Sequence, residues 1–136
     1  MTYRILVTGS RDWSGPSKAG IIRVALTEII KTNIRYGEFV LVHGACPKGA
    51  DRIAHFTWEA FRRAEIPTTL LPAEQYPGEL FRSFKERNQH MVNLGADVCL
   101  AFATNWASGT GQTARMARRA GIRTLDFGAD TRIEAR

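Results

Sequence analysis

The stretch from His43 to Asp51, His-Gly-Ala-Cys-Pro-Lys-Gly-Ala-Asp, combines residue types that can bind an anion. Its glycines, Gly44 and Gly49, let the backbone approach a ligand closely or take a positive φ. Lys48 adds a positive charge, and Asp51 can cap the following helix or accept a hydrogen bond from a ribose hydroxyl. The stretch predicts a nucleotide or phosphate site. An ordinary strand-to-helix turn with a glycine at each bend is the alternative.

A second glycine-containing stretch, Ser108-Gly109-Thr110-Gly111, precedes a segment with helical spacing. The free N–H groups at a helix start and the positive end of the helix dipole favour an anion. The two hydroxyl groups add donors for phosphate oxygens. No Gly-Lys-Ser/Thr sequence follows, which argues against a large ATP-driven motor. The stretch predicts part of a phosphate cradle, with a flexible glycine loop as the alternative.

A third candidate follows the first apolar run, where Gly9, Ser10 and Arg11 offer close backbone, a hydroxyl group and a guanidinium. Arginine binds phosphate through two parallel hydrogen bonds, so we expect these residues to contact the ligand. A surface ion pair of Arg11 with Asp12 or Asp51 is the alternative.

Trp13 and Trp106 lie on two loops that are predicted to face each other. An aromatic ring on such a loop can stack on a base, which is worth ~1–3 kcal/mol in nucleic-acid systems. Packing of each ring against its own loop is the alternative.

The third predicted helix carries a polar residue, Asn88, on its apolar stripe of Phe81, Phe84 and Met91. A buried amide without hydrogen bonds costs about 1–3 kcal/mol. We therefore expect Asn88 to meet backbone at the strand ends or a ligand, and its neighbour Arg87 is a further ligand-binding candidate.

The remaining candidates for chemistry are few. His43 ends a strand and could bond a ligand, whereas His55 is expected to be structural. No Ser/His/Asp or Cys/His arrangement identifies a nucleophile, and no CxxC or HxxxH spacing predicts a metal site. No cofactor is indicated beyond a nucleotide ligand. Asp51 is the candidate for a catalytic carboxylate.

Strands and helices must alternate along the chain to position these loops. Apolar runs predict strands, and helical spacing predicts the segments between them. The strands are expected at residues 4–8, 39–42, 68–71, 98–102 and 123–127, and the helices at 17–35, 50–64, 79–94 and from the second glycine stretch to residue 120. This pattern predicts an α/β, doubly wound, Rossmann-like domain. Its mostly parallel five-stranded sheet has the order 3-2-1-4-5 and helices on both faces. The loops after strands 1, 2 and 4 then meet where such sheets bind ligands.

The composition predicts one domain, residues 1–127, followed by a polar tail, 128–136. The formal net charge of +6 favours nucleotides, single-stranded nucleic acid or an acidic protein as partners. No apolar run approaches the ~20 residues of a membrane helix, so no membrane partner is expected. No signal peptide is recognised, and the two cysteines are expected to be reduced thiols. The expected location is therefore cytoplasmic. Arg115, Arg118 and Arg119 share a helix face that is either solvated or a nucleic-acid patch.

The chain resembles the YspA-like branch of the SLOG superfamily of Rossmann-like nucleotide-binding proteins. The resemblance implies a doubly wound fold that binds a nucleotide or nucleotide-derived ligand, and, because SLOG relatives often assemble, a homo-oligomer. The matching pieces are Gly9-Ser10-Arg11, His43-Gly44 through Gly49-Ala50-Asp51, Arg87-Asn88 with Met91, Ala96-Asp97, Ala101-Phe102, and Gly109-Thr110 with Ala120-Gly121-Ile122.

Two related families imply two further functions. The LOG phosphoribohydrolases carry a PGGxGTxxE loop, which Gly109-Thr110 resembles, but Thr113 stands at the glutamate position. A carboxylate for a LOG-like nucleotide phosphoribohydrolase would have to come from Asp12 or Asp51. The DNA-processing protein DprA carries a GID…AH segment similar to Gly49-Ala50-Asp51 with Ala54-His55, which implies binding of single-stranded DNA. The 136 residues are expected to form one domain, without the extra domains of that family.

Overall fold

The structure, a computed structural model, describes residues 1–128. One sheet has the order β3-β2-β1-β5-β6, with β4 also paired to β2, and every described strand pair is parallel. The strands are β1 (Thr2–Gly9), β2 (Glu38–His43), β3 (Thr69–Leu70), β4 (Glu74–Gln75), β5 (Val98–Ala103) and β6 (Arg123–Gly128). The predicted strand order is confirmed, with β5 and β6 as its fourth and fifth strands.

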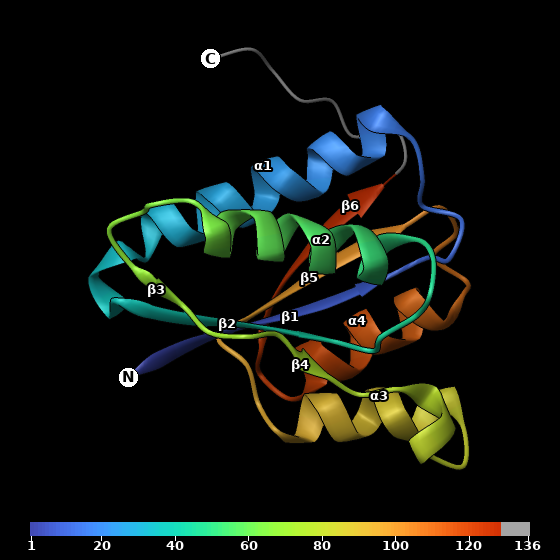
Figure 1. Ribbon diagram of the computed structural model, residues 1–136. Helices are drawn as coiled ribbons and strands as arrows, with labels where there is room; N and C mark the ends of the chain where they lie inside the picture. The colour runs from blue at the N-terminus through green and yellow to red at the C-terminus, as the bar shows by residue number, and fades with distance from the viewer. Residues whose placement is uncertain (129–136) are drawn as a thin grey trace.

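Within residues 1–128, four α-helices cover the sheet, two on each face. They are α1 (Pro16–Thr32), α2 (Ala50–Arg63), α3 (Phe84–Asn93) and α4 (Gly109–Arg119), with short 3-10 helices at Ile34–Tyr36 and Gly78–Leu80. Figure 1 shows α1 and α2 on one face and α3 and α4 on the other. The predicted doubly wound α/β architecture is therefore confirmed.

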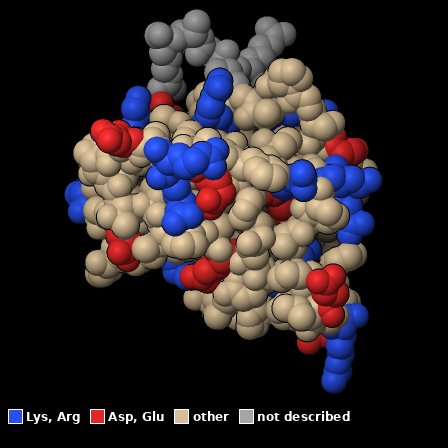
Figure 2. Space-filling view, viewed as in Figure 1, with Lys and Arg blue, Asp and Glu red and all other residues tan. Residues whose placement is uncertain are grey.

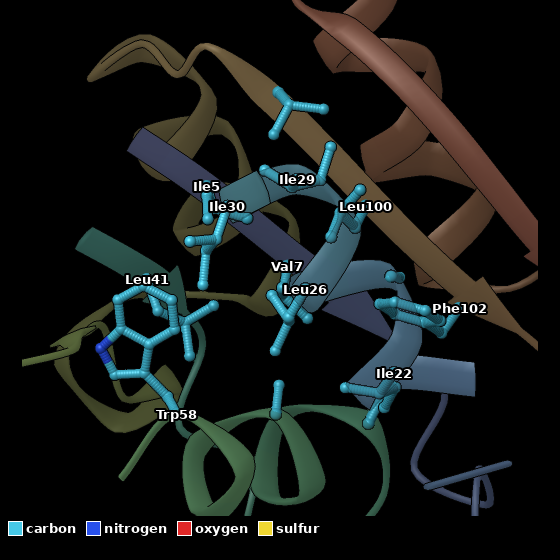
Figure 3. Packing of buried hydrophobic residues seen from close by; sticks show 14 of the residues in the cluster. Ile5, Val7, Ile22, Leu26, Ile29, Ile30, Leu41, Trp58, Leu100 and Phe102 are labelled. Atoms are coloured by element: carbon cyan, nitrogen blue, oxygen red, sulfur yellow. The ribbon is translucent and has the colours of Figure 1, made fainter. Parts of the chain in front are cut away.

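The apolar strands are covered on both faces, as their sequence requires. Successive side chains of a strand point to opposite faces. Ile5 and Val7 of β1 therefore pack in the cluster under α1 and α2, while Leu6 joins the cluster under α3 and α4. Figure 3 shows residues of α1 and α2 meeting those of β1, β2 and β5 in the first cluster. Trp58 of α2 is fully buried there, and its Nε1 donates to the Leu71 carbonyl at 2.8 Å.

The third helix begins later than the sequence pattern predicts. A helix was expected over 79–94, but α3 begins at Phe84, after the 3-10 helix at Gly78–Leu80. The reason is a helix cap, because the Ser83 hydroxyl accepts a hydrogen bond from the Glu86 N–H at 3.1 Å. Such a cap fixes the first turn and leaves the preceding residues free to follow another path.

The third strand is divided into two pieces. A strand was expected over 68–71, but β3 covers only Thr69–Leu70, and β4 adds Glu74–Gln75 beside the end of β2. Pro72, between them, has no N–H and interrupts the ladder. Glu74 is held in place by Arg4 of β1, whose Nη1 lies 2.8 Å from its carboxylate.

The carboxyl ends of β1, β2 and β5 lie at one edge of the sheet, as Figure 1 shows. The register aligns Leu6 with Val42 and Gly9 with Phe102, so the loops that follow these strands start side by side. The chain leaves β1 for α1 on one face and β5 for α4 on the other. This reversal between β1 and β5 is where doubly wound sheets form their ligand crevice.

The end of the chain lies largely outside the described residues. β6 extends through Gly128, the first residue of the predicted polar tail. The rest of that predicted tail, 129–136, falls outside the part of the chain that the structure describes.

Candidate functional site

A cavity of about 1180 Å³ opens at the carboxyl ends of β1, β2 and β5. Its wall comes from the loops after these strands and from the segment that leads into α3. Among the residues predicted to bind a ligand, those in the wall are Gly9, Ser10, Arg11, Gly44, Asp51, Arg87, Asn88, Ser108, Gly109 and Thr110. Lys48, Gly49, Gly111, Trp13 and Trp106 are not part of the wall. The separate segments therefore meet at one cavity, as expected from the topology.

The N-terminus of α4 supplies backbone donors to this cavity. Ser108 is the N-cap, but its hydroxyl donates to the Asn105 carbonyl instead of capping the helix. The first helical bond runs from the Gln112 N–H to the Ser108 carbonyl, so the N–H groups of the first turn have no acceptor within the helix. A Cβ added at Gly109 would meet no atom within 4 Å. Gly109 therefore faces open space, with an N–H that can bind an anion.

Ser10 ties the loops after β1 and β5 together. Its N–H donates to the Phe102 carbonyl at 2.9 Å, and its hydroxyl oxygen accepts the Thr104 N–H at 3.0 Å. The Thr104 hydroxyl in turn donates to Asp12 at 2.7 Å. The Ser10 hydroxyl keeps its own proton, which can be donated into the cavity.

Two predicted binding glycines serve contacts between chain segments. Gly49 has φ 82, and a Cβ there would overlap the backbone of Ser10 and Arg11. The next residue, Ala50, donates its N–H to the Ser10 carbonyl at 3.1 Å. A Cβ on Gly111 would overlap the Trp106 carbonyl. Both glycines therefore let loops approach each other, and Lys48 beside Gly49 is exposed to solvent.

Arg87 holds the loop after β2 against α3. Its Nη1 donates to the carbonyls of Gly44 at 2.6 Å and Tyr76 at 3.2 Å, and its Nε donates to Asn88 Oδ1 at 2.7 Å. Most of its hydrogen-bonding directions are thus used within the protein. Asn88, which was expected to meet strand-end backbone or a ligand, has its oxygen bonded to Arg87.

Asp51 is a buried carboxyl group on the cavity wall. It lies in the first turn of α2, and its Oδ2 accepts the Cys46 N–H at 3.3 Å. Burial raises the pKa of Asp51 to about 6, although Arg87 and Arg11 act in the opposite direction. This carboxyl group therefore changes its charge close to neutral pH.

The two histidines next to this loop bond to each other, and neither is part of the cavity wall. His43 Nδ1 accepts the Ala45 N–H at 2.9 Å, so a neutral His43 carries its proton on Nε2, which lies 2.9 Å from His55 Nδ1. Burial, with His55 and Arg87 nearby, lowers the pKa of His43 to about 4. Ala45 has φ 55, a conformation that the His43 bond helps to hold. His43 thus shapes the loop and is not part of the cavity wall.

Neither tryptophan is part of the cavity wall, whereas one phenylalanine is. Trp13 is fully buried, donates from Nε1 to the Lys18 carbonyl at 2.9 Å and packs against Phe102. Its ring has no exposed face on which a base could stack. This agrees with the alternative that the ring packs within the protein. Trp106 is partly exposed on the loop before α4. Phe84 lies in the wall, and its half-exposed ring was missed because its spacing matches an apolar helix stripe.

The features that would suggest other kinds of site are limited. Within residues 1–128, no three His, Cys, Asp or Glu residues are placed to hold a metal ion. No helix in this part of the chain is long and apolar enough to cross a membrane. On the arginine face of α4, Arg118 forms an ion pair with Asp126 at 2.7 Å. Figure 2 shows basic residues interspersed with acidic ones on the face viewed.

Comparisons with known proteins identify the family of this chain. The model of the YspA, cpYpsA-related SLOG family matches residues 3–73, which span β1 to β3 and include the loops after β1 and β2. The Gene 61 protein of Mycobacterium phage D29 is 32% identical over 128 residues, covering 92% of this chain and 96% of that protein. No solved structure gives a significant match. With both the matched segment and the doubly wound sheet in agreement, the chain belongs to the YspA, cpYpsA-related SLOG family.

Proposed function

We propose that the cavity binds a nucleotide or nucleotide-derived ligand, with the phosphate at the N-terminus of α4. The N–H groups of Gly109 and Thr110 donate to phosphate oxygens, and the Ser10 hydroxyl and Arg11 guanidinium reach the same group. Membership of the SLOG family, which suggests a nucleotide-related ligand, supports this assignment. The size of the cavity, about 1180 Å³, is above the ~300–1,000 Å³ typical of small-ligand sites and leaves room for a substituted nucleotide.

One observation carries the proposal: the first turn of α4 presents unpaired N–H groups to a cavity that also contains a guanidinium. A phosphate there gains charge-assisted hydrogen bonds and a favourable helix dipole. Thr113, which stands at the glutamate position of the LOG loop, is fully buried, and its hydroxyl donates to the Gly109 carbonyl at 2.9 Å. The first turn of α4 carries no acidic residue, while Asp12 of the cavity wall already accepts the Thr104 hydroxyl.

Gly109→Pro tests the phosphate site by removing one N–H. Proline is tolerated at the first helical position, and Ser108 before it already has the extended ψ of −178° that proline requires. We expect affinity for nucleoside monophosphates, measured by calorimetry, to fall about 10- to 100-fold, the loss of one hydrogen bond to a charged group. Affinity for the matching nucleosides should change much less.

Gly109→Ala is the matched control, because it keeps the N–H and places its Cβ in open space. It should bind like the wild type, and circular dichroism should show the same helix content in all three proteins. Equal affinity of the proline and alanine variants for monophosphates would place the phosphate elsewhere. No binding of mono-, di- or cyclic nucleotides at millimolar concentration would contradict the proposed function as a whole.

A second candidate function is hydrolysis of the N-glycosidic bond of a nucleotide, and Asp51 is the observation that favours it. A carboxyl group with a pKa of about 6 can exchange a proton with a base or a water near neutral pH. Asp51 lies in the same cavity wall as the proposed phosphate site. Water would add across the bond between ribose and base, releasing the free base and the ribose phosphate.

Asp51→Asn tests this reaction, because it keeps the shape of the side chain and removes the titration. Release of base from nucleoside monophosphates should fall about 100-fold or more, the usual contribution of a general acid or base. The rate of the wild type should change with pH around 6, and this dependence should vanish in the variant. Calorimetry should show that the variant still binds nucleotide. An unchanged rate would remove Asp51 from the chemistry.

The protein's location and assembly are part of the same proposal. Cys46 and Cys99 are both free thiols, which suits a reducing cytoplasm. Assembly into a homo-oligomer is a further expectation, which sedimentation or light scattering tests directly.

A further inference from the structure

Phe84 is a large aromatic side chain in the cavity wall that remains 53% exposed. It is the first residue of α3, directly after the Ser83 cap. A Cβ added at Gly78 would overlap the edge of the Phe84 ring, so the ring lies against the backbone of the 3-10 helix. The helix cap and this contact hold the ring in one place at the cavity, while much of its surface stays open.

Two guanidinium groups of the cavity wall already lie over this ring. Arg11 Cζ is 4.7 Å from the ring centroid, and Arg87 Cζ is 5.3 Å from it. Arg87 is fixed by its bonds to backbone carbonyls, whereas no described hydrogen bond or ion pair holds the Arg11 guanidinium. The Phe84 ring is thus placed to stack flat groups inside the cavity.

The contacts also give the order of groups along the cavity. The loop before α4 touches Ser10 through the bond from the Thr104 N–H. Arg11 follows Ser10 in the chain and reaches Phe84. Arg11 therefore lies between the phosphate site at the start of α4 and the aromatic ring of α3. A molecule with an anionic end and a flat aromatic end matches this order.

We propose that Phe84 is the stacking platform for the base of the bound nucleotide, an inference that rests on the proposed nucleotide binding. The base lies on the part of the ring that the guanidinium groups leave open, and Arg11 bridges to the phosphate. The ring makes no base-specific hydrogen bond, so stacking accepts purines and pyrimidines alike. The ligand class is therefore a nucleotide with an intact base, as opposed to a sugar phosphate.

The test compares Phe84→Ala with the wild type for two kinds of probe. The first kind is the 5′-monophosphates of adenosine, guanosine, cytidine and uridine, and the second is ribose 5-phosphate, which has no base. The loss of one stacking contact should weaken the tightest monophosphate about 5- to 100-fold. Ribose 5-phosphate, measured by competition, should change less than about twofold. Phe84→Trp should restore monophosphate binding.

Phe56 provides the matched control. It is a phenylalanine of α2, 55% exposed, with the guanidinium of Arg52 4.8 Å from its ring centroid, but it is not part of the cavity wall. Phe56→Ala should therefore leave the affinity for every probe unchanged. Because both side chains are exposed, neither substitution is expected to unfold the protein.

The outcomes separate this inference from the function on which it rests. Wild-type binding of monophosphates that Phe84→Ala leaves unchanged overturns the stacking role alone. An equal loss for monophosphate and ribose 5-phosphate also overturns it, because Phe84 would then act only by placing Arg11. A wild type that binds none of these probes at millimolar concentration overturns the nucleotide function itself, and the stacking role with it.

Discussion

Gly49→Ala is expected to lower the free energy of unfolding by about 2–5 kcal/mol, much of the stability of a domain of this size. The residue has φ 82, which costs a side chain about 1–2 kcal/mol. The added Cβ would also overlap the backbone of Ser10 and Arg11. Overpacking against rigid backbone adds about 1–3 kcal/mol. Urea denaturation followed by circular dichroism measures the loss.

Gly37→Ala is the control for this substitution. Gly37 has a similar φ of 73, but a Cβ there would meet no atom within 4 Å. Its alanine variant should lose only the conformational part, about 1–2 kcal/mol. The difference between the two variants isolates the contact between the loops after β1 and β2. Equal losses at both positions would mean that this close approach is not needed for stability.

The Gly49 substitution should also weaken ligand binding, because it moves Ser10 and Arg11 in the cavity wall. We expect nucleotide affinity to fall in Gly49→Ala and to stay near the wild-type value in Gly37→Ala, once both are measured where the proteins are folded. A Gly49→Ala protein that is destabilised but binds with full affinity would show that the two loops need not touch for the site to form.

Arg87→Ala is expected to lower the free energy of unfolding by about 2–4 kcal/mol, because it removes the donor from the carbonyl of buried Gly44 and from two half-buried acceptors. The carbonyl of buried Gly44 loses its 2.6 Å hydrogen bond, and the Asn88 oxygen loses its partner. The guanidinium also lowers the pKa of Asp51, so its removal raises that pKa above about 6. The variant should therefore be less stable and should depend differently on pH.

The sign of the pH effect follows from proton binding in the two states. Asp51 has an ordinary pKa of 3.8 and a folded pKa of about 6, so the folded state binds its proton more tightly. The contribution of Asp51 to stability therefore falls as the pH rises from about 3.8 to about 6. With a still higher folded pKa in Arg87→Ala, this fall continues past pH 6. The stability gap to the wild type should widen between pH 6 and pH 8.

Arg87→Lys separates the charge from the hydrogen bonds. Lysine keeps the positive charge near Asp51 but cannot bond the Gly44 and Tyr76 carbonyls and the Asn88 oxygen with one planar group. It should lose stability to an extent that hardly varies with pH. Chemical denaturation at pH 5, 6, 7 and 8 distinguishes the variants. A gap for Arg87→Ala that is the same at every pH would contradict the coupling to Asp51.

The sheet and the meeting of its loops could be predicted from the sequence because they depend on patterns of several residues. Apolar runs such as Val98–Ala103 identify buried strands, and the regular alternation with helices restricts the topology. Given that order, the carboxyl ends of neighbouring parallel strands must share one edge. The cavity wall accordingly contains Ser10, Gly44 and Ser108 from three loops that are distant in sequence.

The roles of individual residues could not be predicted in this way, because they depend on contacts across the fold. Glycine is equally suited to approach a ligand or another chain segment. Only the structure shows that Gly49 approaches Ser10, whereas Gly109 faces open space. The aromatic residues Phe84 and Trp13 likewise have different roles that their sequence positions do not reveal. The first turn of α3 carries Phe84 into the cavity wall, and the path of the loop after β1 places Trp13 in the core.

The division of the third strand has a consequence for how separate molecules meet. A long, straight border strand offers consecutive free N–H and C=O groups to which another polypeptide can add, a route to fibrils and precipitates. Here that border consists of two strands of two residues each, with Pro72 between them. A neighbouring molecule therefore meets few consecutive backbone N–H and C=O groups with which it could pair as an added strand. This side of the folded protein should therefore resist ordered self-aggregation, even in concentrated solution.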